Sequence, residues 1–468
     1  MFLILLLHLS YLGLGLLIIS LIFKHEEYPY SFRLLIAYFV GIFVNVLFIH
    51  IAIIATLTSP LISWSFLIIG MAGLACEIRF VIKTNVIKLN AFFSSPKNLI
   101  LNISITILLI PVLYLITLKL VGLPDVTYDS TAIWNLKAKF FFYGEHLWTD
   151  AFMNTYRVHP NSDYPLYMPI FIFEHFSIIG MADDWVTKFG TWIYYTSGMI
   201  LFFMIIRQWT GTKIALLATI FMLYSPLYSY NSIQGSITNT YMDFPLSLMI
   251  AASVGLFIRY QFHNNPLDIF GASVFVASAI LLKREGSLWF ILFVSFALLA
   301  MVFTRKKSWQ NEYAWLILPI LVFFCWQLIR TRMPPPISDI QITTSFEIIT
   351  SEPVFSLSSI FTKMIKAWLI SIIKIRLWGL FPIFVIPYFV FGLLINLRNL
   401  TILLTAFMVL GYLGGIFLAL MLFDLNTGGF DGYMIFVYHR AIIQLLPVSL
   451  LLAIFMNSNK FTNRLVSQ

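Results

Sequence analysis

Long apolar runs, each of about 20 residues, follow one another along almost the whole chain and limit the folds that it can adopt. A helix of about 20 apolar residues spans the hydrocarbon core of a bilayer. The runs are solidly apolar and lack the alternation that is typical of a membrane β-barrel. Charged residues make up 10% of the 468 residues, against about a quarter in a soluble domain. The sequence therefore predicts an all-α polytopic membrane protein.

We expect about 13 transmembrane helices from these runs. A cleaved signal peptide at residues 1–23 is the alternative for the first run, but that run is too long and has no basic segment before it. Residues 365–379 carry three basic residues and are expected to form an interfacial helix before a span kinked by Pro382 and Pro387. The expected spans are residues 1–23, 34–57, 61–79, 99–121, 186–206, 214–231, 241–260, 268–285, 287–303, 314–331, 380–396, 400–423 and 440–456.

The distribution of basic residues predicts the orientation, because cytoplasmic loops carry an excess of Lys and Arg. With the first terminus outside, the short inner segments hold 15 of the 29 Lys and Arg residues, and most acids lie outside. The long loop 122–185 then faces away from the cytoplasm. The net charge of +9 follows from this asymmetry, so we expect a lipid bilayer and no nucleic acid as a partner.

Residues 123–184 gather polar, acidic and aromatic side chains in one place. Residues 130–143 have apolar residues at helical spacing with two lysines beside them, the pattern of a helix in the membrane interface. Asp129 stands at the start of this helix, where a carboxylate can cap the helix, act as a catalytic group, or do both. Residues 163–166 and Pro169 predict an extended entry into a partly buried helix.

His159 and Asp163 lie in the same loop, and turn formation alone can explain both residues. Together with Glu174 and His175 they could be drawn as a metal site, but their spacing matches no strong ligand pattern. Aromatic rings such as Tyr128, Trp134 and Tyr164 offer flat faces on which a ligand could stack. Membrane interfaces also collect Trp and Tyr without any ligand.

Three further charged features are expected on the outer side. Asp243 starts the seventh span, and an acid at membrane depth is a functional hypothesis, with helix capping as the alternative. Lys283, Arg284 and Glu285 form the turn between two spans, where a lysine paired with its own glutamate could also be a snorkelling anchor. Arg440 opens the last span as an anchor or a ligand. Acids and cations on one membrane face indicate a site for a charged lipid head group.

Several motifs in this order resemble the polytopic GT-C glycosyltransferases, including bacterial lipopolysaccharide-core enzymes and protein O-mannosyltransferases. The resemblance spans roughly residues 100–455. It implies a catalytic domain at 99–456 with outer loops 122–185 and 332–379, preceded by a three-helix membrane extension at 1–98 and followed by a cytoplasmic tail at 457–468. The motifs are residues 128–138, the segment 159–169, residues 241–246, the turn 283–286, and Arg440 with residues 444–447.

The resemblance implies transfer of a sugar from a polyprenyl-phosphate-linked donor to an acceptor at the extracytoplasmic face, with inversion at the anomeric carbon. Such a protein is a multi-pass membrane protein, of the inner membrane in a bacterium. The roles that it implies are catalysis by Asp129 and Asp243, and binding of the donor phosphate by Lys137, Lys283, Arg284 and Arg440. Apart from the resemblance, we expect the substrate to be bound by Tyr128, Trp134, His159, Asp163, Tyr164 and Glu285. Asp129 lacks the acidic neighbour of the mannosyltransferases, which leaves the acceptor type open.

Chemistry supports these roles. A carboxylate that accepts the proton of an acceptor hydroxyl contributes about a hundredfold to ten-thousandfold. The phosphate leaving group needs cations more than a general acid. Two other functions remain open: a transporter or flippase of lipid-linked sugars, which should carry mid-span polar residues, and a polysaccharide polymerase or ligase. The sequence leaves open which sugar is moved, whether the acceptor is a glycolipid, a glycan or a protein, and whether a divalent cation assists.

Overall fold

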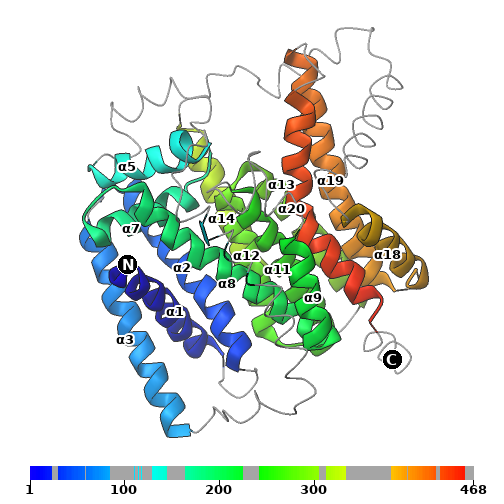
Figure 1. The fold of residues 1–468 in the computed structure, drawn as a ribbon, viewed down its shortest axis with the longest axis horizontal. Coiled ribbons are helices and arrows are strands. Elements are labelled where there is room, and N and C mark those ends of the chain that lie inside the picture. The colour runs from blue at the N-terminus through cyan, green and yellow to red at the C-terminus, as the bar shows by residue number, and fades with distance from the viewer. Residues whose placement is uncertain are drawn as a thin grey trace.

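The structure is a computed structural model in which every element of the described part is helical, as expected for an all-α membrane protein (Figure 1). No strand occurs within this part of the chain. The described residues are 1–23, 30–57, 60–84, 110, 114, 117–118, 129–144, 164–224, 242–304, 312–333, 381–397, 399–427 and 433–458.

Most expected spans coincide with helices. The long helices are α1 (Phe2–Ile22), α2 (Tyr30–Ile54), α3 (Pro60–Thr84), α8 (Asp184–Thr210), α11 (Asp243–His263), α13 (Arg284–Thr304), α19 (Leu400–Thr427) and α20 (Tyr433–Met456). Shorter ones are α9 (Thr212–Leu223), α12 (Pro266–Leu282), η5 (Glu312–Leu316) with α14 (Ile317–Arg330), and α18 (Phe381–Ile395). Seven helices of the described part are long and apolar enough to cross a membrane. The number 13 stays a prediction, because the span 99–121 lies almost wholly outside the described residues.

Helix α11 forms the centre of the bundle, and its whole apolar stretch is buried. It packs against α12 and α20 and also against α8 (Figure 1). Helices α3, α13 and α14 instead leave apolar side chains such as Ile68, Val302 and Leu328 exposed. A helix that is apolar on every side suits either a protein core or a lipid environment, and this bundle contains both kinds.

The first three helices pack very closely. A Cβ atom on Gly13 would lie 1.9 Å from the carbonyl oxygen of Gly70, and one on Gly41 would lie 1.8 Å from that of Tyr11. Small residues at such crossings let two backbones approach, which is the usual way in which membrane helices associate. α1 therefore contacts both α2 and α3 along its length.

The predicted helix at residues 130–143 is present, as a π-helix, η3 (Asp129–Asn135), that continues into α5 (Leu136–Phe142). Ile133 and Phe141 are buried, as the helical spacing predicted. The predicted helix after Pro165 is α7 (Tyr167–Ile179), and nearly every residue of it is buried. α5 and α7 lie next to each other at one end of the bundle (Figure 1). Both belong to the expected outer loop 122–185, and they bring its described parts against the helical core.

Candidate active site

Asp243 is the first residue of α11, and its side chain is fully buried. One carboxylate oxygen, Oδ1, accepts a hydrogen bond from Lys283 Nζ at 2.7 Å and one from Gln444 Nε2 at 2.8 Å. The N-cap position of α11 is Met242, so helix capping does not account for this acid. A carboxylate in the first turn is also favoured by the helix dipole. Asp243 is therefore a fixed, ion-paired carboxylate at a helix start.

Lys283 reaches Asp243 because the chain turns sharply between α12 and α13. Its backbone is extended, with φ −155° and ψ 155°, between the last residue of one helix and the first of the next. The turn brings the two helices so close that a Cβ atom on Gly286 would lie 1.8 Å from the carbonyl oxygen of Ala279. Lys283 Nζ also lies 2.8 Å from Glu285 Oε1, and the lysine side chain is 4% exposed. The lysine is paired with its own glutamate, as expected, but it points into the protein and does not snorkel to water.

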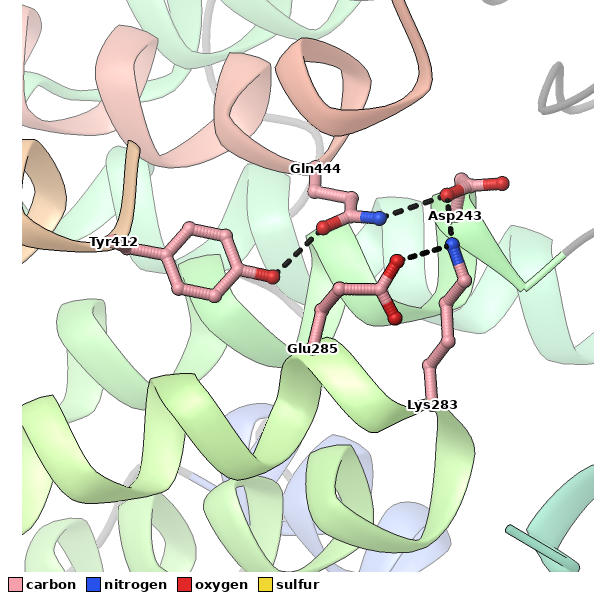
Figure 2. Close-up of polar contacts among 5 residues, drawn as sticks. All are labelled: Asp243, Lys283, Glu285, Tyr412 and Gln444. Atoms are coloured by element: carbon pink, nitrogen blue, oxygen red, sulfur yellow. Dashed lines mark hydrogen bonds and ion pairs between the residues drawn. The ribbon is translucent and has the colours of Figure 1, made fainter. Parts of the chain in front are cut away.

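Helices α19 and α20 complete this group of side chains. Tyr412 on α19 donates to Gln444 Oε1 at 2.7 Å, and Gln444 passes the contact on to Asp243 (Figure 2). Figure 2 also shows the second carboxylate oxygen of Asp243 directed away from Lys283 and Gln444. We call Asp243, Lys283, Glu285, Tyr412 and Gln444 the carboxylate–lysine cluster.

A second group of predicted residues gathers around Tyr164. The Tyr164 carbonyl accepts a hydrogen bond from Lys137 Nζ at 2.9 Å. The Tyr164 ring lies under the guanidinium of Arg284, with 4.7 Å from Cζ to the ring centroid, and meets the Trp134 ring edge-on at 5.5 Å. We call Trp134, Lys137, Tyr164 and Arg284 the Tyr164 group. It adjoins the carboxylate–lysine cluster because Arg284 follows Lys283 in the chain.

The two groups differ in charge. In the carboxylate–lysine cluster, Lys283 stands between two carboxylates. The Tyr164 group contributes two cations, Lys137 and Arg284. Burial, and then the charge of Arg284, lower the pKa of the fully buried Lys137 well below its ordinary value. A fully buried lysine and a partly buried arginine on either side of Tyr164 make a place where an anion is favoured.

For several other predicted site residues, the side chain or the whole residue lies outside the described part of the chain. Asp129 begins η3, and Arg440 lies within α20, but their side chains are outside the described residues. Tyr128, His159 and Asp163 are wholly outside them. Of the residues drawn as a metal site, Glu174 and His175 lie buried on α7. The described part of the chain contains no group of three His, Cys, Asp or Glu residues that could hold a metal ion.

Gln444 and Tyr412 are site residues that sequence reasoning did not select. Gln444 belongs to residues 444–447, one of the motifs that resemble the GT-C enzymes. A polar amide inside an apolar helix is the sequence feature that could have selected it. Tyr412 gave no signal, because nothing in a single apolar helix tells which tyrosine faces a distant glutamine. Both are buried, and their hydrogen bonds fix the direction of the Asp243 carboxylate.

The arrangement combines what a transfer of a phosphate-linked group needs. Cations with a stacked aromatic ring suit an anionic leaving group, since guanidinium binds oxyanions through its edge while its face packs on a ring. Ordered carboxylates suit hydroxyl groups of a sugar and the proton of a nucleophile. The buried positions exclude water, which strengthens these electrostatic interactions.

Comparison with known proteins agrees with this chemistry. Residues 162–329 match a family model described as dolichyl-phosphate-mannose-protein mannosyltransferase. The matched segment contains Tyr164, α7, Asp243 and the turn from Lys283 to Glu285. Searches of curated proteins and of solved structures found no match. Together with the apolar helices that surround the site, the family match supports the resemblance to the GT-C membrane glycosyltransferases that the motifs indicate.

Proposed function

We propose that the protein transfers a sugar from a polyprenyl-phosphate-linked donor to a hydroxyl group of a glycolipid, an envelope glycan or a protein, on the extracytoplasmic face of the membrane. The observation that carries the proposal is the meeting of buried cations, ordered carboxylates and an aromatic ring at the starts of α11 and α13. The family match supports a polyprenyl-phosphate sugar as the donor.

In the proposed reaction, the acceptor oxygen attacks the anomeric carbon on the side opposite the phosphate. The new glycosidic bond forms as the bond from the anomeric carbon to the phosphate oxygen breaks, so the configuration inverts. The hydroxyl proton goes to a carboxylate, and polyprenyl phosphate leaves with the electron pair of the broken bond. A base within reach of that hydroxyl is worth about a hundredfold to ten-thousandfold.

Asp129 is the proposed base, and Asp243 is the proposed second acid. The contacts of Asp243 support this division, because its Oδ1 already accepts from Lys283 at 2.7 Å and from the Gln444 amide, whereas a base needs an oxygen that is open to the acceptor hydroxyl. Asp243 would then orient Lys283 and bind a sugar hydroxyl. Trp134, Tyr164 and Glu285 are the proposed sugar contacts, together with Tyr128, His159 and Asp163.

Lys137, Arg284, Lys283 and Arg440 are the proposed ligands of the donor phosphate. Lys137 and Arg284 are best supported, since both contact Tyr164. Lys283 is already neutralised by two carboxylates, so a phosphate would have to compete with them. We therefore expect Arg284→Gln to weaken donor binding more directly than Lys283→Gln, whose main effect should be on the order of the cluster.

The test is release of polyprenyl phosphate from a panel of radiolabelled polyprenyl-phosphate sugars by the purified protein in lipid, with and without envelope acceptors. Acceptor-dependent release by the native protein and its loss in Asp129→Asn is the expected result. If the donor stays intact in every case but crosses the bilayer of sealed vesicles, the protein is a transporter. Full transfer by Asp129→Asn would move the role of base to Asp243.

A further inference from the structure

A group of buried polar side chains lies where the first two helices meet α7, away from the carboxylate–lysine cluster. Such groups are costly in an apolar bundle unless their hydrogen bonds are made. Each of these side chains is at most 7% exposed. We call the group the α7 clamp, and its members are His8 and Tyr11 on α1, Tyr38 and Asn45 on α2, and Glu174 and His175 on α7.

Glu174 is held by both N-terminal helices. Tyr11 OH donates to Glu174 Oε2 at 3.0 Å, and Asn45 Nδ2 donates to Oε1. The two oxygens of one carboxyl group therefore bind α1 and α2 separately. A side chain tied to two helices at once fixes both the rotation of α7 and its position along its axis.

His175 is held in a second, directional chain of hydrogen bonds. Its Nδ1 lies 2.7 Å from the Phe171 carbonyl, which can only accept, so Nδ1 carries the proton and Nε2 of the neutral ring accepts. His8 Nε2, 3.1 Å away, must then donate, which leaves His8 Nδ1 to accept from Tyr38 OH at 2.6 Å. With both rings neutral, these contacts allow one tautomer for each ring.

Helix α8 closes the clamp from the other side. A Cβ atom on Gly190 would lie 2.1 Å from His175 Nε2, so the α8 backbone presses on the imidazole ring. The ring cannot turn away from His8 without meeting this backbone. The clamp is thus a packed hydrogen-bonding unit, of the kind whose parts are worth more together than separately.

The clamp is connected to the Tyr164 group through α7 itself. Tyr164 stands three residues before Tyr167, the first residue of the helix, and the stiff Pro165 lies between them. A shift of α7 therefore moves both the Tyr164 carbonyl that binds Lys137 and the Tyr164 ring that lies under Arg284. The side-chain orientations of Lys137 and Arg284 therefore depend on the position of α7.

We propose that His8, Tyr11, Tyr38 and Asn45 are positioning residues for sugar transfer, which act through Glu174 and His175 to place Tyr164. The first two helices are then a working part of the transferase. The proposal rests on the proposed function in one respect, the naming of Lys137 and Arg284 as ligands of the donor phosphate.

Two substitutions at one position test the clamp. Glu174→Leu removes both acceptors, whereas Glu174→Gln keeps the shape, accepts from Asn45 and offers an N–H to the Tyr11 hydroxyl. We expect Glu174→Leu to raise the donor KM at least about tenfold, because small misplacements of binding groups are costly, and Glu174→Gln to stay near the native value. Tyr11→Phe keeps the packed ring and should give a smaller increase in KM if Glu174→Leu fails to fold.

The matched control is Ser177→Ala, which also removes a buried hydrogen bond from α7. Within the described part of the chain, the Ser177 hydroxyl bonds to the Phe173 carbonyl of its own helix at 2.8 Å and to neither α1 nor α2, so its loss should leave those two helices in place. A double-mutant cycle with Tyr164→Leu separates positioning from general destabilisation. Tyr164→Leu removes the ring but keeps the carbonyl that binds Lys137, so Glu174→Leu should raise the donor KM by a smaller factor in the Tyr164→Leu background than in the native protein.

A second measurement does not need activity. Spin labels at the exposed positions Tyr143 and Met181, with Cys76 and Cys325 replaced by Ser, report how α7 lies relative to α5. We expect one narrow distance distribution in the native protein and in Glu174→Gln, and a broad one in Glu174→Leu. Ser177→Ala should leave the distribution narrow.

The outcomes distinguish the two proposals. An unchanged donor KM in Glu174→Leu, or equal losses in Glu174→Gln and Glu174→Leu, would overturn the positioning role. Additive effects with Tyr164→Leu would overturn its action through the Tyr164 ring. If the native protein transfers no sugar from any donor, the proposed function fails. The distance distributions then decide alone, and a narrow distribution in Glu174→Leu overturns the clamp while a broad one supports it.

Discussion

Replacing Lys283 by Met should destabilise the protein strongly, because it leaves the Asp243 carboxylate buried without its cation. The two charges lie 2.7 Å apart, and at an effective dielectric constant of about 20 they attract each other by about 6 kcal/mol. Desolvation of both groups offsets part of this attraction, and the Gln444 amide remains to bind Asp243. Loss of one partner of a buried pair typically costs about 3–5 kcal/mol, which is the range we expect for Lys283→Met.

The chain contains a matched control for this experiment. Lys139 and Asp184 make an ion pair at 3.0 Å whose side chains are 36% and 40% exposed, whereas Lys283 and Asp243 are 4% and 0% exposed. An exposed pair contributes about 0–1 kcal/mol, so Lys139→Met should change stability little. The two variants remove the same chemical group from the same type of pair, and they differ in burial.

The measurement is the free energy of unfolding in bicelles for the native protein, both Lys→Met variants, Asp243→Asn and the double variant Lys283→Met with Asp243→Asn. The double variant no longer buries the Asp243 carboxylate without its lysine, and only the less buried Glu285 still loses Lys283, so it should be more stable than Lys283→Met alone. Equal costs for Lys283→Met and Lys139→Met would refute the reasoning, as would strict additivity of the two substitutions in the cluster.

Four further predictions concern turnover, donor binding and pH. Asp129→Asn should lower the rate of acceptor-dependent transfer by about a hundredfold to ten-thousandfold while binding of donor is retained, which a filter-binding assay beside the turnover assay checks. Arg284→Gln should raise the donor KM about tenfold or more, since a hydrogen bond to a charged group contributes about 1.5–3 kcal/mol, and an unchanged KM would remove Arg284 from the phosphate site. Burial, and then Arg284, lower the folded-state pKa of Lys137 below its ordinary 10.5. Between those two pKa values the unfolded chain binds more protons, so stability should rise with pH there, and Lys137→Met should flatten that rise in unfolding measurements. A bound phosphate favours the charged lysine, so donor affinity should fall as pH rises through the same window, and a pH-independent donor KM would speak against Lys137 as a ligand.

Hydropathy and residue spacing predicted the helices well, because both patterns extend over only a few neighbouring residues. The apolar runs predicted α1, α2, α3, α8, α11, α12 and α13, because a segment that must satisfy its backbone in lipid has no other regular choice. The spacing of Ile133 and Phe141 predicted η3 and α5, and Pro165 predicted the entry into α7. The start of α20 lies at Tyr433, seven residues before the expected residue 440, because the polar residues there do not end the helix.

The residue types of the site could also be predicted, since acids and cations are rare in this chain and stand out. Asp243, Lys283 and Glu285 were selected on that ground and do meet, as do Trp134, Lys137, Tyr164 and Arg284. Hydrogen-bonding partners of these charged residues that belong to a common residue type could not be selected from the sequence. Tyr412 is one of 22 tyrosines, and only the packing of α19 against α20 distinguishes it.

The sequence by itself determined that this chain is a bundle of apolar helices with its polar chemistry gathered near a few helix ends, because hydropathy and helix-start signals act over one or two turns. Tertiary structure alone decided that Lys283 stands between two carboxylates, that Lys137 is buried beside Arg284, and that α1 and α2 bind α7 through Glu174 and His175. These contacts join residues as far as 167 positions apart, and their strength depends on burial and direction. The burial of a side chain and the direction of its hydrogen bonds cannot be read from a single residue type. Both are set only when the helices pack.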